Sequence, residues 1–263
     1  MSTQFVTNTV NVHVEGRVAT VQMNRPQSLN ALDKEMIKGL VARLKEISTS
    51  DDIDIVVLTG NERAFSSGGD IKSMLSTVKD ENDFYNIMDA INELVVTIYS
   101  LPMVTISAVS GAAAGLGLSL ALATDYILAD ENSKLAMNFI GIGLIPDGGA
   151  HFFLERRLGE DKAKHLIWEG KPLSAEEALK IGLIHEVAVD YKEALNNKIA
   201  EWQAKPLQAM IKTKKILAER NRPHLLKTLE LEKYAQHKMR QTEDHMEGIQ
   251  AFIEKRKPQF RGK

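Results

Sequence analysis

Hydrophobic and polar residues alternate in the first patterned stretch of the chain. The alternation runs over residues 10–14, pauses at a turn that contains glycine, and resumes over residues 18–23. A period of two is typical of a strand with one buried face, and two such runs joined by a short turn indicate a β-hairpin. The pattern therefore predicts a hairpin over residues 10–23.

Helical and buried-strand patterns follow. From Asp33, the expected N-cap, apolar residues recur every three or four positions up to Ile47. Residues 53–58 and 104–109 are short, largely apolar and β-branched runs, typical of strands covered on both faces. Residues 71–101 between them carry an apolar stripe at helical spacing. The first half of the chain is therefore expected to form a layered α/β core.

The pattern becomes helical from Ser174 onwards. Residues 174–177 have the spacing of a capping box, and residues 191–257 are rich in helix-forming and charged residues. Pro206 and Pro223 are expected to mark breaks between helices. The sequence thus predicts a core over residues 1–195 and a helical region over residues 196–263, with the last third wholly α-helical.

The amino-acid composition and net charge exclude some kinds of chemistry and some kinds of partner. The 263 residues include no cysteine, which excludes disulfides and thiolate chemistry, and the net charge of -2 gives no field that would attract nucleic acid. The N-terminus lacks the pattern of a leader peptide, and the apolar runs are too short to cross a bilayer. We therefore expect a cytoplasmic protein with neither nucleic acid nor membrane as a partner.

A first candidate site is the glycine-rich stretch Ser67-Gly68-Gly69-Asp70-Ile71-Lys72, which follows a predicted strand. Adjacent glycines let the backbone approach a ligand closely, and a helix beginning near Asp70 offers unpaired N–H groups to a developing anion. A plain turn with Asp70 as helix cap fits the same residues. No G-x-S-x-G motif surrounds the serines, so a serine nucleophile is not expected.

A second candidate is the small-residue turn at 109–117, which leads into an apolar helix beginning near Leu116. Its N–H groups would also converge on one point, although a tightly packed buried helix explains the alanines equally well. The glycine spacing also resembles that of short-chain dehydrogenases, and Tyr234 with Lys238 has their Tyr-x-x-x-Lys spacing. Position excludes that alternative, because a dinucleotide fold places its glycine turn after the first strand.

A third candidate is Asp147, which lies between a proline and two glycines after the apolar run 139–145. A turn former or N-cap is the simpler interpretation. A carboxylate at the end of a buried apolar run is partly desolvated, however, which raises its pKa toward a value useful for proton transfer. His151, one turn later, is interpreted first as a helix-face residue. The histidines are scattered and form no H-E-x-x-H motif, so no metal site is expected.

Taken together, these segments resemble the enoyl-CoA hydratase/isomerase (crotonase) superfamily from about residue 10 to residue 260. The order and spacing of the matching stretches make the resemblance specific. These stretches are Asn-Arg-Pro at 24–26, Leu-Asn-Ala-Leu at 29–32, Phe-Ser-Ser-Gly-Gly-Asp-Ile-Lys at 65–72, Ala-Val-Ser-Gly at 108–111, Gly115 and Gly117, Gly-Leu-Ile-Pro-Asp-Gly-Gly at 143–149, the segments 174–178 and 182–186, and 247–256.

The resemblance implies an α/β fold built as a spiral of β-β-α units, followed by a C-terminal α-helical region that joins subunits into homotrimers or homohexamers. It also implies an acyl-CoA thioester substrate and no separate cofactor. In this family the N–H groups matching Gly69 and Leu116 hold the thioester oxygen as it gains negative charge, which is worth roughly 3–4 kcal/mol per donor. Substrate contacts are implied for Ala31, Ser67 and residues 69–72, namely Gly69, Asp70, Ile71 and Lys72.

Two departures from the family pattern bear on the reaction. Family hydratases use a pair of glutamates, and the matching positions here are Ser119 and Phe139. Asp147 matches the acidic residue of several isomerases in the superfamily, and one carboxylate is enough to shuttle one proton. We therefore expect an enoyl-CoA isomerase that moves a 3-enoyl double bond to position 2 or isomerises a ring-derived enoyl-CoA. An atypical hydratase and a non-catalytic acyl-CoA-binding protein are the alternatives.

Overall fold

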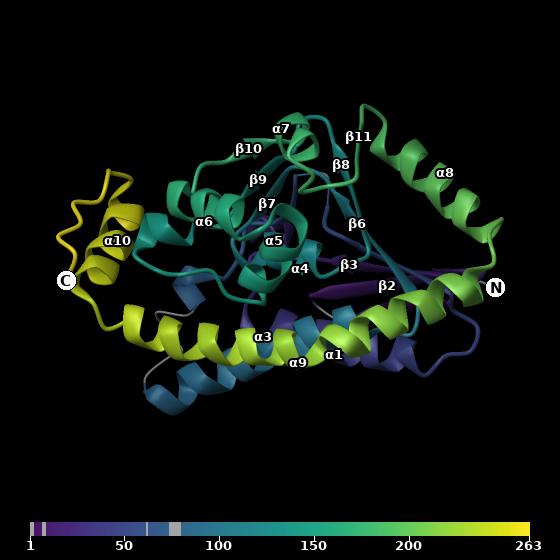
Figure 1. Cartoon of the computed structure of the whole chain (residues 1–263), viewed down its shortest axis with the longest axis horizontal. Coiled ribbons are helices and arrows are strands. Elements are labelled where there is room, and N and C mark those ends of the chain that lie inside the picture. Colours follow the sequence, from purple (N-terminus) through teal and green to yellow (C-terminus); the bar gives the residue numbers. More distant parts are fainter. Residues whose placement is uncertain (1–2, 7–8, 62, 74–79) are drawn as a thin grey trace.

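The protein is described by a computed structural model, which defines residues 3–6, 9–61, 63–73 and 80–263. Two β-sheets form its centre (Figure 1). The larger has the strand order β1 (Thr3–Val6), β2 (Val10–Glu15), β3 (Val18–Met23), β4 (Ile55–Thr59), β6 (Val104–Val109), β8 (Tyr126–Asp130) and β11 (Glu186–Ala188). The smaller has the order β10 (Leu173–Ser174), β9 (Lys134–Ala136), β7 (Ala112–Ala114) and β5 (Ala64–Ser66).

The predicted hairpin is confirmed, because β2 and β3 pair antiparallel with Val10 opposite Met23. From β3 onward the strands of the larger sheet pair in parallel. Parallel strands need crossover connections, and helices supply them. They are α1 (Lys34–Ser48), capped by Asp33 as expected, and α3 (Glu81–Ser100). Residues 71–73 are also helical, and residues 74–79 of the predicted 71–101 helix lie outside the described part of the chain.

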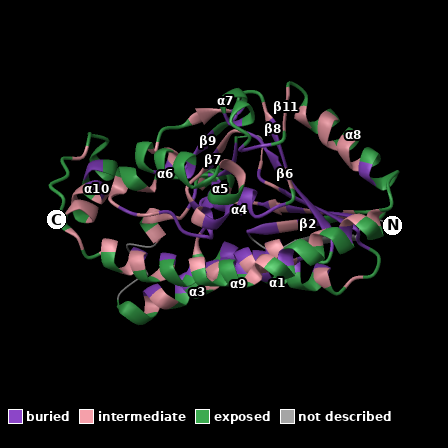
Figure 2. Cartoon of the chain, viewed as in Figure 1, coloured by how far each residue is buried: buried purple, intermediate pink, exposed green. Residues whose placement is uncertain are grey.

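The two faces of the larger sheet bury two separate hydrophobic clusters. Successive side chains of β4 point to opposite faces, so Val56 joins the cluster under α1 and α3 whereas Val57 joins the cluster that includes Trp202. Trp202 belongs to α8 (Tyr191–Gln203). Because both faces of the sheet are covered, successive residues of these strands are all apolar, as the sequence indicated. Figure 2 shows the buried positions gathered at the centre of the fold.

The remaining helices lie mostly in the second half of the chain. They are α4 (Leu116–Leu122), α5 (Ala150–Leu158), α6 (Glu160–Glu169), α7 (Ala175–Lys180), α9 (Leu207–Met239) and α10 (Glu243–Glu254), with short 3₁₀ turns η1 (Pro26–Ser28) and η2 (Phe139–Ile142). The predicted capping box is present at the start of α7. Within the described residues, no helix is both long enough and apolar enough to cross a membrane.

Two predictions about the last third were wrong. The chain is not wholly helical there, because residues 186–188 add the edge strand β11 beside β8. Pro223 does not separate two helices either, since it lies inside α9. A proline removes one helical hydrogen bond, but α9 buries Ala218, Leu225 and Leu229 on either side of it. Tertiary packing therefore maintains the helix through Pro223, whereas Pro206 does mark the helix boundary at the N-cap of α9.

Candidate active site

Two of the predicted turns lie side by side, at the carboxyl ends of two adjacent strands of the smaller sheet. Strands β5 and β7 pair in parallel, so the turn after β5 and the turn after β7 emerge in the same direction. Gly68 has a φ of 95° and approaches the second turn so closely that a Cβ there would lie 2.8 Å from Ala114 O and 3.5 Å from Leu116 N. The structure therefore brings Gly68 and Leu116, which are far apart in sequence, to one place.

The backbone on both sides of Gly69 fixes the direction of its N–H group. Leu32 N donates to Gly68 O over 2.7 Å, and Asp70 N donates to Leu32 O over 3.1 Å. Along an extended segment successive peptide groups point to opposite sides. The C=O of Gly68 and the N–H of Gly69 belong to one trans peptide and point in opposite directions, so the N–H group of Gly69 points away from Leu32.

Leu116 is the first residue of α4, and Gly115 is the N-cap. The first N–H groups of an α-helix have no carbonyl one turn earlier to receive them, so they are available to an acceptor beyond the helix end. The helix itself is buried along its whole length. Of the predicted pair of main-chain donors, Leu116 is therefore fixed by a buried helix, and Gly69 lies in a turn whose backbone pairs with Leu32.

Asp147 lies on the same helix end. A Cβ at Gly148 would lie 2.6 Å from the Leu116 side chain and 3.0 Å from Ser119 Cβ, so the loop that carries Asp147 packs directly on α4. The hydroxyl of Ser119 donates to Asp147 O over 2.8 Å. Three predicted segments, around residues 68, 116 and 147, are therefore in contact.

The Asp147 carboxyl group is almost completely buried, with 6% of the residue exposed. Its Oδ2 atom accepts a hydrogen bond from Gln236 Nε2 over 3.0 Å, whereas Oδ1 is buried without a partner in the described structure. Burial raises the pKa of this carboxyl to about 7; the hydrogen bond from Gln236 opposes that rise, the charge of Glu232 adds to it and that of His151 opposes it. Such a group exchanges protons near neutral pH.

Glu232 is a second buried carboxylate near Asp147, and its oxygens are engaged. Oε2 accepts from Gly149 N over 2.7 Å, while Oε1 accepts from His151 N over 3.1 Å and contacts His151 Nδ1 at 2.8 Å. Glu232 thus joins α9 to the start of α5. His151, predicted to be a helix-face residue, is held there by this contact.

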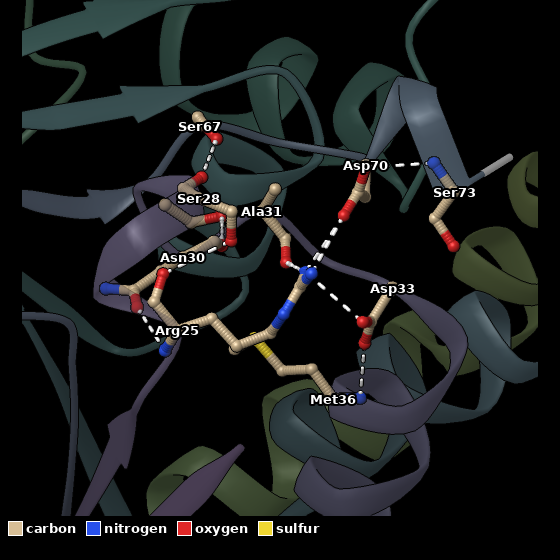
Figure 3. A network of polar contacts seen from close by, with 10 residues as sticks. Arg25, Ser28, Asn30, Ala31, Asp33, Met36, Ser67, Asp70 and Ser73 are labelled. Carbon is tan, nitrogen blue, oxygen red and sulfur yellow. Dashed lines mark hydrogen bonds and ion pairs between the residues drawn. The ribbon is translucent and has the colours of Figure 1, made fainter. Parts of the chain in front are cut away.

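A polar network around Arg25 joins the 25–33 segment to Asp70, which follows the Gly68-Gly69 turn (Figure 3). The Arg25 guanidinium donates to Ala31 O over 2.5 Å and to Asp70 Oδ2 over 3.0 Å, and it also pairs with Asp33 at 3.2 Å. Asp70 Oδ1 accepts from Ser73 N, which makes Asp70 the cap of the short helical turn at 71–73. Its carboxylate therefore has structural partners on both oxygens.

The other predicted substrate-binding residues surround this network. Ser67 is exposed and donates from its hydroxyl to Ser28 O over 3.2 Å, while Ala31 is 8% exposed. Ile71 is half-buried and Lys72 is exposed at the rim. Ser67 is thus tied to Ser28, and Ala31 to Arg25 and through it to Asp70, so these predicted residues are linked by one polar network.

Sequence reasoning missed the partners that hold the site. Arg25 and Asn30 were recognised only as parts of a family pattern, and Glu232 and Gln236 were not recognised at all. A signal for the last two was present, because Leu225, Leu229, Glu232 and Gln236 follow one helical stripe. Polar residues on a buried stripe need specific partners.

A cavity of about 270 Å³ lies elsewhere, between α4, α5 and α9, and none of the predicted site residues lines it. Its buried cations have partners inside the protein. Lys214 Nζ pairs with Asp125 at 2.8 Å, and Arg157 donates to the main-chain oxygens of Leu122 and Thr124. In the described ranges, no group of three or more His, Asp or Glu residues is placed to bind a metal ion.

Comparison with known proteins places the chain in a family. The family model described as "Enoyl-CoA hydratase/isomerase" matches residues 13–263. The Bacillus subtilis protein YhaR, named as an enoyl-CoA hydratase/isomerase, is 48% identical over 93% of this chain and 96% of its own length. The 1,2-epoxyphenylacetyl-CoA isomerase of Escherichia coli is 34% identical over 95% of this chain and 97% of its own length.

Among solved structures, an enoyl-CoA hydratase from Mycobacterium avium subsp. paratuberculosis superposes with a TM-score of 0.87. It is 32% identical, and the match covers 98% of this chain and all of that chain. The fold class predicted from the sequence is thereby confirmed. The chain belongs to the enoyl-CoA hydratase/isomerase (crotonase) superfamily.

Proposed function

We propose that this member of the superfamily is an enoyl-CoA isomerase that uses Asp147 as its single proton-transfer group. One observation carries the proposal: a buried carboxyl with a pKa of about 7 and an unpartnered Oδ1 atom is carried by a loop that packs on α4. A base with this pKa is half ionised at neutral pH. It can therefore accept a proton from carbon and return it without a second titrating group.

The proposed reaction conserves the proton. The N–H groups of Gly69 and Leu116 hold the thioester oxygen, and ionised Asp147 takes the proton from the carbon next to the thioester. The electrons of the broken C–H bond pass into the enolate, where the two donors stabilise the charge on oxygen. Asp147 then returns the same proton to the carbon two positions further along, so the double bond moves from position 3 to position 2.

A ring-derived enoyl-CoA is a second substrate type for the same chemistry. It includes an epoxide of phenylacetyl-CoA, the substrate type named for the E. coli relative. Ala31, Ser67, Asp70, Ile71 and Lys72 are proposed to contact the CoA portion, in the case of Asp70 through its main chain. The homotrimer or homohexamer, with residues 196–263 as its joining region, and the cytoplasmic location remain predictions.

Hydration is the alternative reaction, and the local chemistry favours isomerisation over it. Adding water across a double bond needs groups that both activate water and deliver a proton. The Ser119 hydroxyl is engaged with Asp147 O, and Phe139 has no titratable group. Glu232 is engaged with Gly149 and His151. Asp147 is thus left as the proton carrier among these groups.

Assays with two thioesters separate the reactions. With a 3-enoyl-CoA, an isomerase increases the absorbance of the conjugated enoyl thioester. With crotonyl-CoA, which is already conjugated, a hydratase decreases it. We expect the increase and little decrease; fast loss of crotonyl-CoA absorbance with no action on 3-enoyl-CoA would make the enzyme a hydratase.

The Asp147→Asn variant tests the assigned base. It keeps the shape of the side chain and removes the proton acceptor, so acyl-CoA affinity should stay while turnover falls by at least a hundredfold. Unchanged turnover would falsify the assignment. A non-catalytic acyl-CoA-binding protein is tested separately, since it predicts that wild-type protein exchanges no solvent deuterium into the α-carbon of a saturated acyl-CoA.

A further inference from the structure

The two oxygens of Asp147 have different surroundings. Oδ2 accepts the amide of Gln236, and Oδ1 is buried without a partner in the part of the chain that the structure describes. Gln236 comes from α9, 89 residues further along the chain, and only 3% of it is exposed. The carboxyl group therefore has one held oxygen and one unoccupied oxygen.

Packing alone does not account for a glutamine at this position. Gln236 Oε1 is itself buried with no hydrogen-bond partner among the described residues. A buried polar atom left unpaired costs roughly 1–3 kcal/mol of stability, so a methionine of similar volume would make this part of the core more stable. The amide must therefore be explained by what it does for Asp147.

An amide is suited to a carboxyl group that changes its protonation state. The NH₂ group of Gln236 donates to Oδ2 when the carboxylate is ionised, and it still donates, more weakly, when the proton is on Oδ1 and Oδ2 is a neutral carbonyl oxygen. A lysine or arginine would stabilise only the ionised form and weaken the base. An apolar residue would leave the ionised form with no donor. Glutamine serves both states without fixing either one.

We propose that Gln236 is a positioning residue that holds Oδ2 of Asp147, so that Oδ1 faces the substrate carbon. This inference rests on the proposed function of Asp147. Gln236 touches neither the substrate nor the reacting atoms, and it acts by orienting the carboxyl group and by responding to its protonation.

The neighbouring turn of α9 fixes Gln236 in place. Glu232, four residues earlier and thus on the same face of the helix, accepts from Gly149 N and His151 N. One helix face therefore binds Asp147 and also Gly149 and His151, which follow it. The charged groups that act on Asp147 are Glu232 from α9 and His151 from α5, while α4 presents the uncharged Ser119 and Leu116.

The Gln236→Met variant separates a positioning role from a packing role. The variant loses a hydrogen bond to a charged acceptor, and such a bond is worth roughly 1.5–3 kcal/mol. Its loss raises the pKa of Asp147, so the acid limb of the kcat/KM profile should move up by about one to two pH units. At high pH, where Asp147 is ionised, kcat should fall about tenfold to a hundredfold while KM changes little. A purely structural role would leave the acid limb in place.

Two further variants complete the test. Gln236→Glu keeps the size of the side chain and puts a second carboxyl group next to Asp147, so the pair should titrate in two steps with one pKa raised strongly. Gln208→Met is the matched control, because Gln208 lies on the same helix and reaches a different carboxylate, Asp54, at 3.4 Å. It should leave the pH profile unchanged.

Titration of a ¹³C-labelled Asp147 carboxyl by NMR gives a readout that does not depend on turnover. We expect a higher midpoint in Gln236→Met than in wild type. An equal midpoint, or an acid limb unmoved in both Gln236 variants, overturns the inference while leaving the role of Asp147 intact. If Asp147→Asn is fully active, the proposed function fails instead, and the NMR midpoint still decides whether Gln236 controls the carboxyl group.

Discussion

The Ser119 hydroxyl donates a hydrogen bond of 2.8 Å to the main-chain oxygen of Asp147. Ser119 is completely buried on α4, the helix that begins at the proposed donor Leu116. The bond ties the proposed base to the helix that carries one of the two proposed oxyanion donors. Under the proposed mechanism, α4 would therefore set the position of the Asp147 main chain relative to the Leu116 N–H group.

Ser119→Ala should therefore weaken both stability and turnover. Loss of the donor leaves the Asp147 carbonyl with only the longer hydrogen bond from Ala150 N at 3.4 Å, which costs about 1 kcal/mol of unfolding free energy, measurable by urea denaturation. Turnover should fall about tenfold, because a displaced loop misaligns the base. Ser133→Ala is the control, since Ser133 is also fully buried and donates to a main-chain oxygen, that of Val109. It should lose similar stability and keep its turnover; equal loss of turnover in both would contradict the argument.

Gly68→Ala should abolish the close contact between the two turns. A Cβ at Gly68 would lie 2.8 Å from Ala114 O, at a φ of 95°. The clash must push the turn away from α4 and displace the neighbouring Gly69 N–H, so we expect turnover at least a hundredfold lower. Gly16 is a control with a positive φ of 56° and nothing within 4 Å of its would-be Cβ. Gly16→Ala should cost about 1–2 kcal/mol and leave turnover unchanged.

Local patterns predicted much of the fold. The β2–β3 hairpin, the Asp33 cap and the capping box at Ser174 each depend on residues within a few positions of one another. The course of α9 through Pro223 could not be predicted in this way, because the packing that maintains it comes from residues distant in sequence. Features that depend on neighbouring residues could be predicted from the sequence, whereas features that depend on contacts between distant residues could not.

The candidate site also contains one residue that local sequence predicts and one that it does not. Asp147 could be singled out because its apolar approach and flanking glycines are adjacent in sequence. Its partner Gln236 lies 89 residues away and has no local signature except a polar residue on a buried stripe. The reactive group was therefore predictable, and the residue that orients it was not.

Arg25→Met should raise the KM for acyl-CoA more than it lowers kcat. Arg25 joins Ala31 O to Asp70, and so holds two of the predicted substrate-contacting segments together. Its loss removes the cation from two partly buried carboxylates, Asp33 and Asp70, which keep only their main-chain hydrogen bonds, at a cost of roughly 3 kcal/mol. We expect KM to rise about tenfold in steady-state assays. Arg43→Met, which removes only an exposed pair with Glu46, should change stability by less than about 1 kcal/mol and leave KM unaltered.

The raised pKa of Asp147 also predicts how stability depends on pH. The carboxyl group has a pKa of about 7 in the folded protein and 3.8 as the ordinary value, so the folded state binds the proton more tightly than the unfolded chain. The resulting stabilisation is present below about pH 4 and is lost as the pH rises to about 7, at a cost of roughly 4 kcal/mol. The Asp147→Asn variant has no ionisable group at this position, so its stability does not include this pH-dependent cost.

Urea unfolding of Asp147→Asn and wild type between about pH 4 and pH 8 measures this effect. The variant should be more stable than wild type at pH 8, by up to roughly 4 kcal/mol, and the difference should shrink toward pH 4. Asp52→Asn, at an exposed turn, should show no such trend. A difference between Asp147→Asn and wild type that stays constant with pH would mean that the carboxyl group is not desolvated, and the basis for its use as a base at neutral pH would be lost.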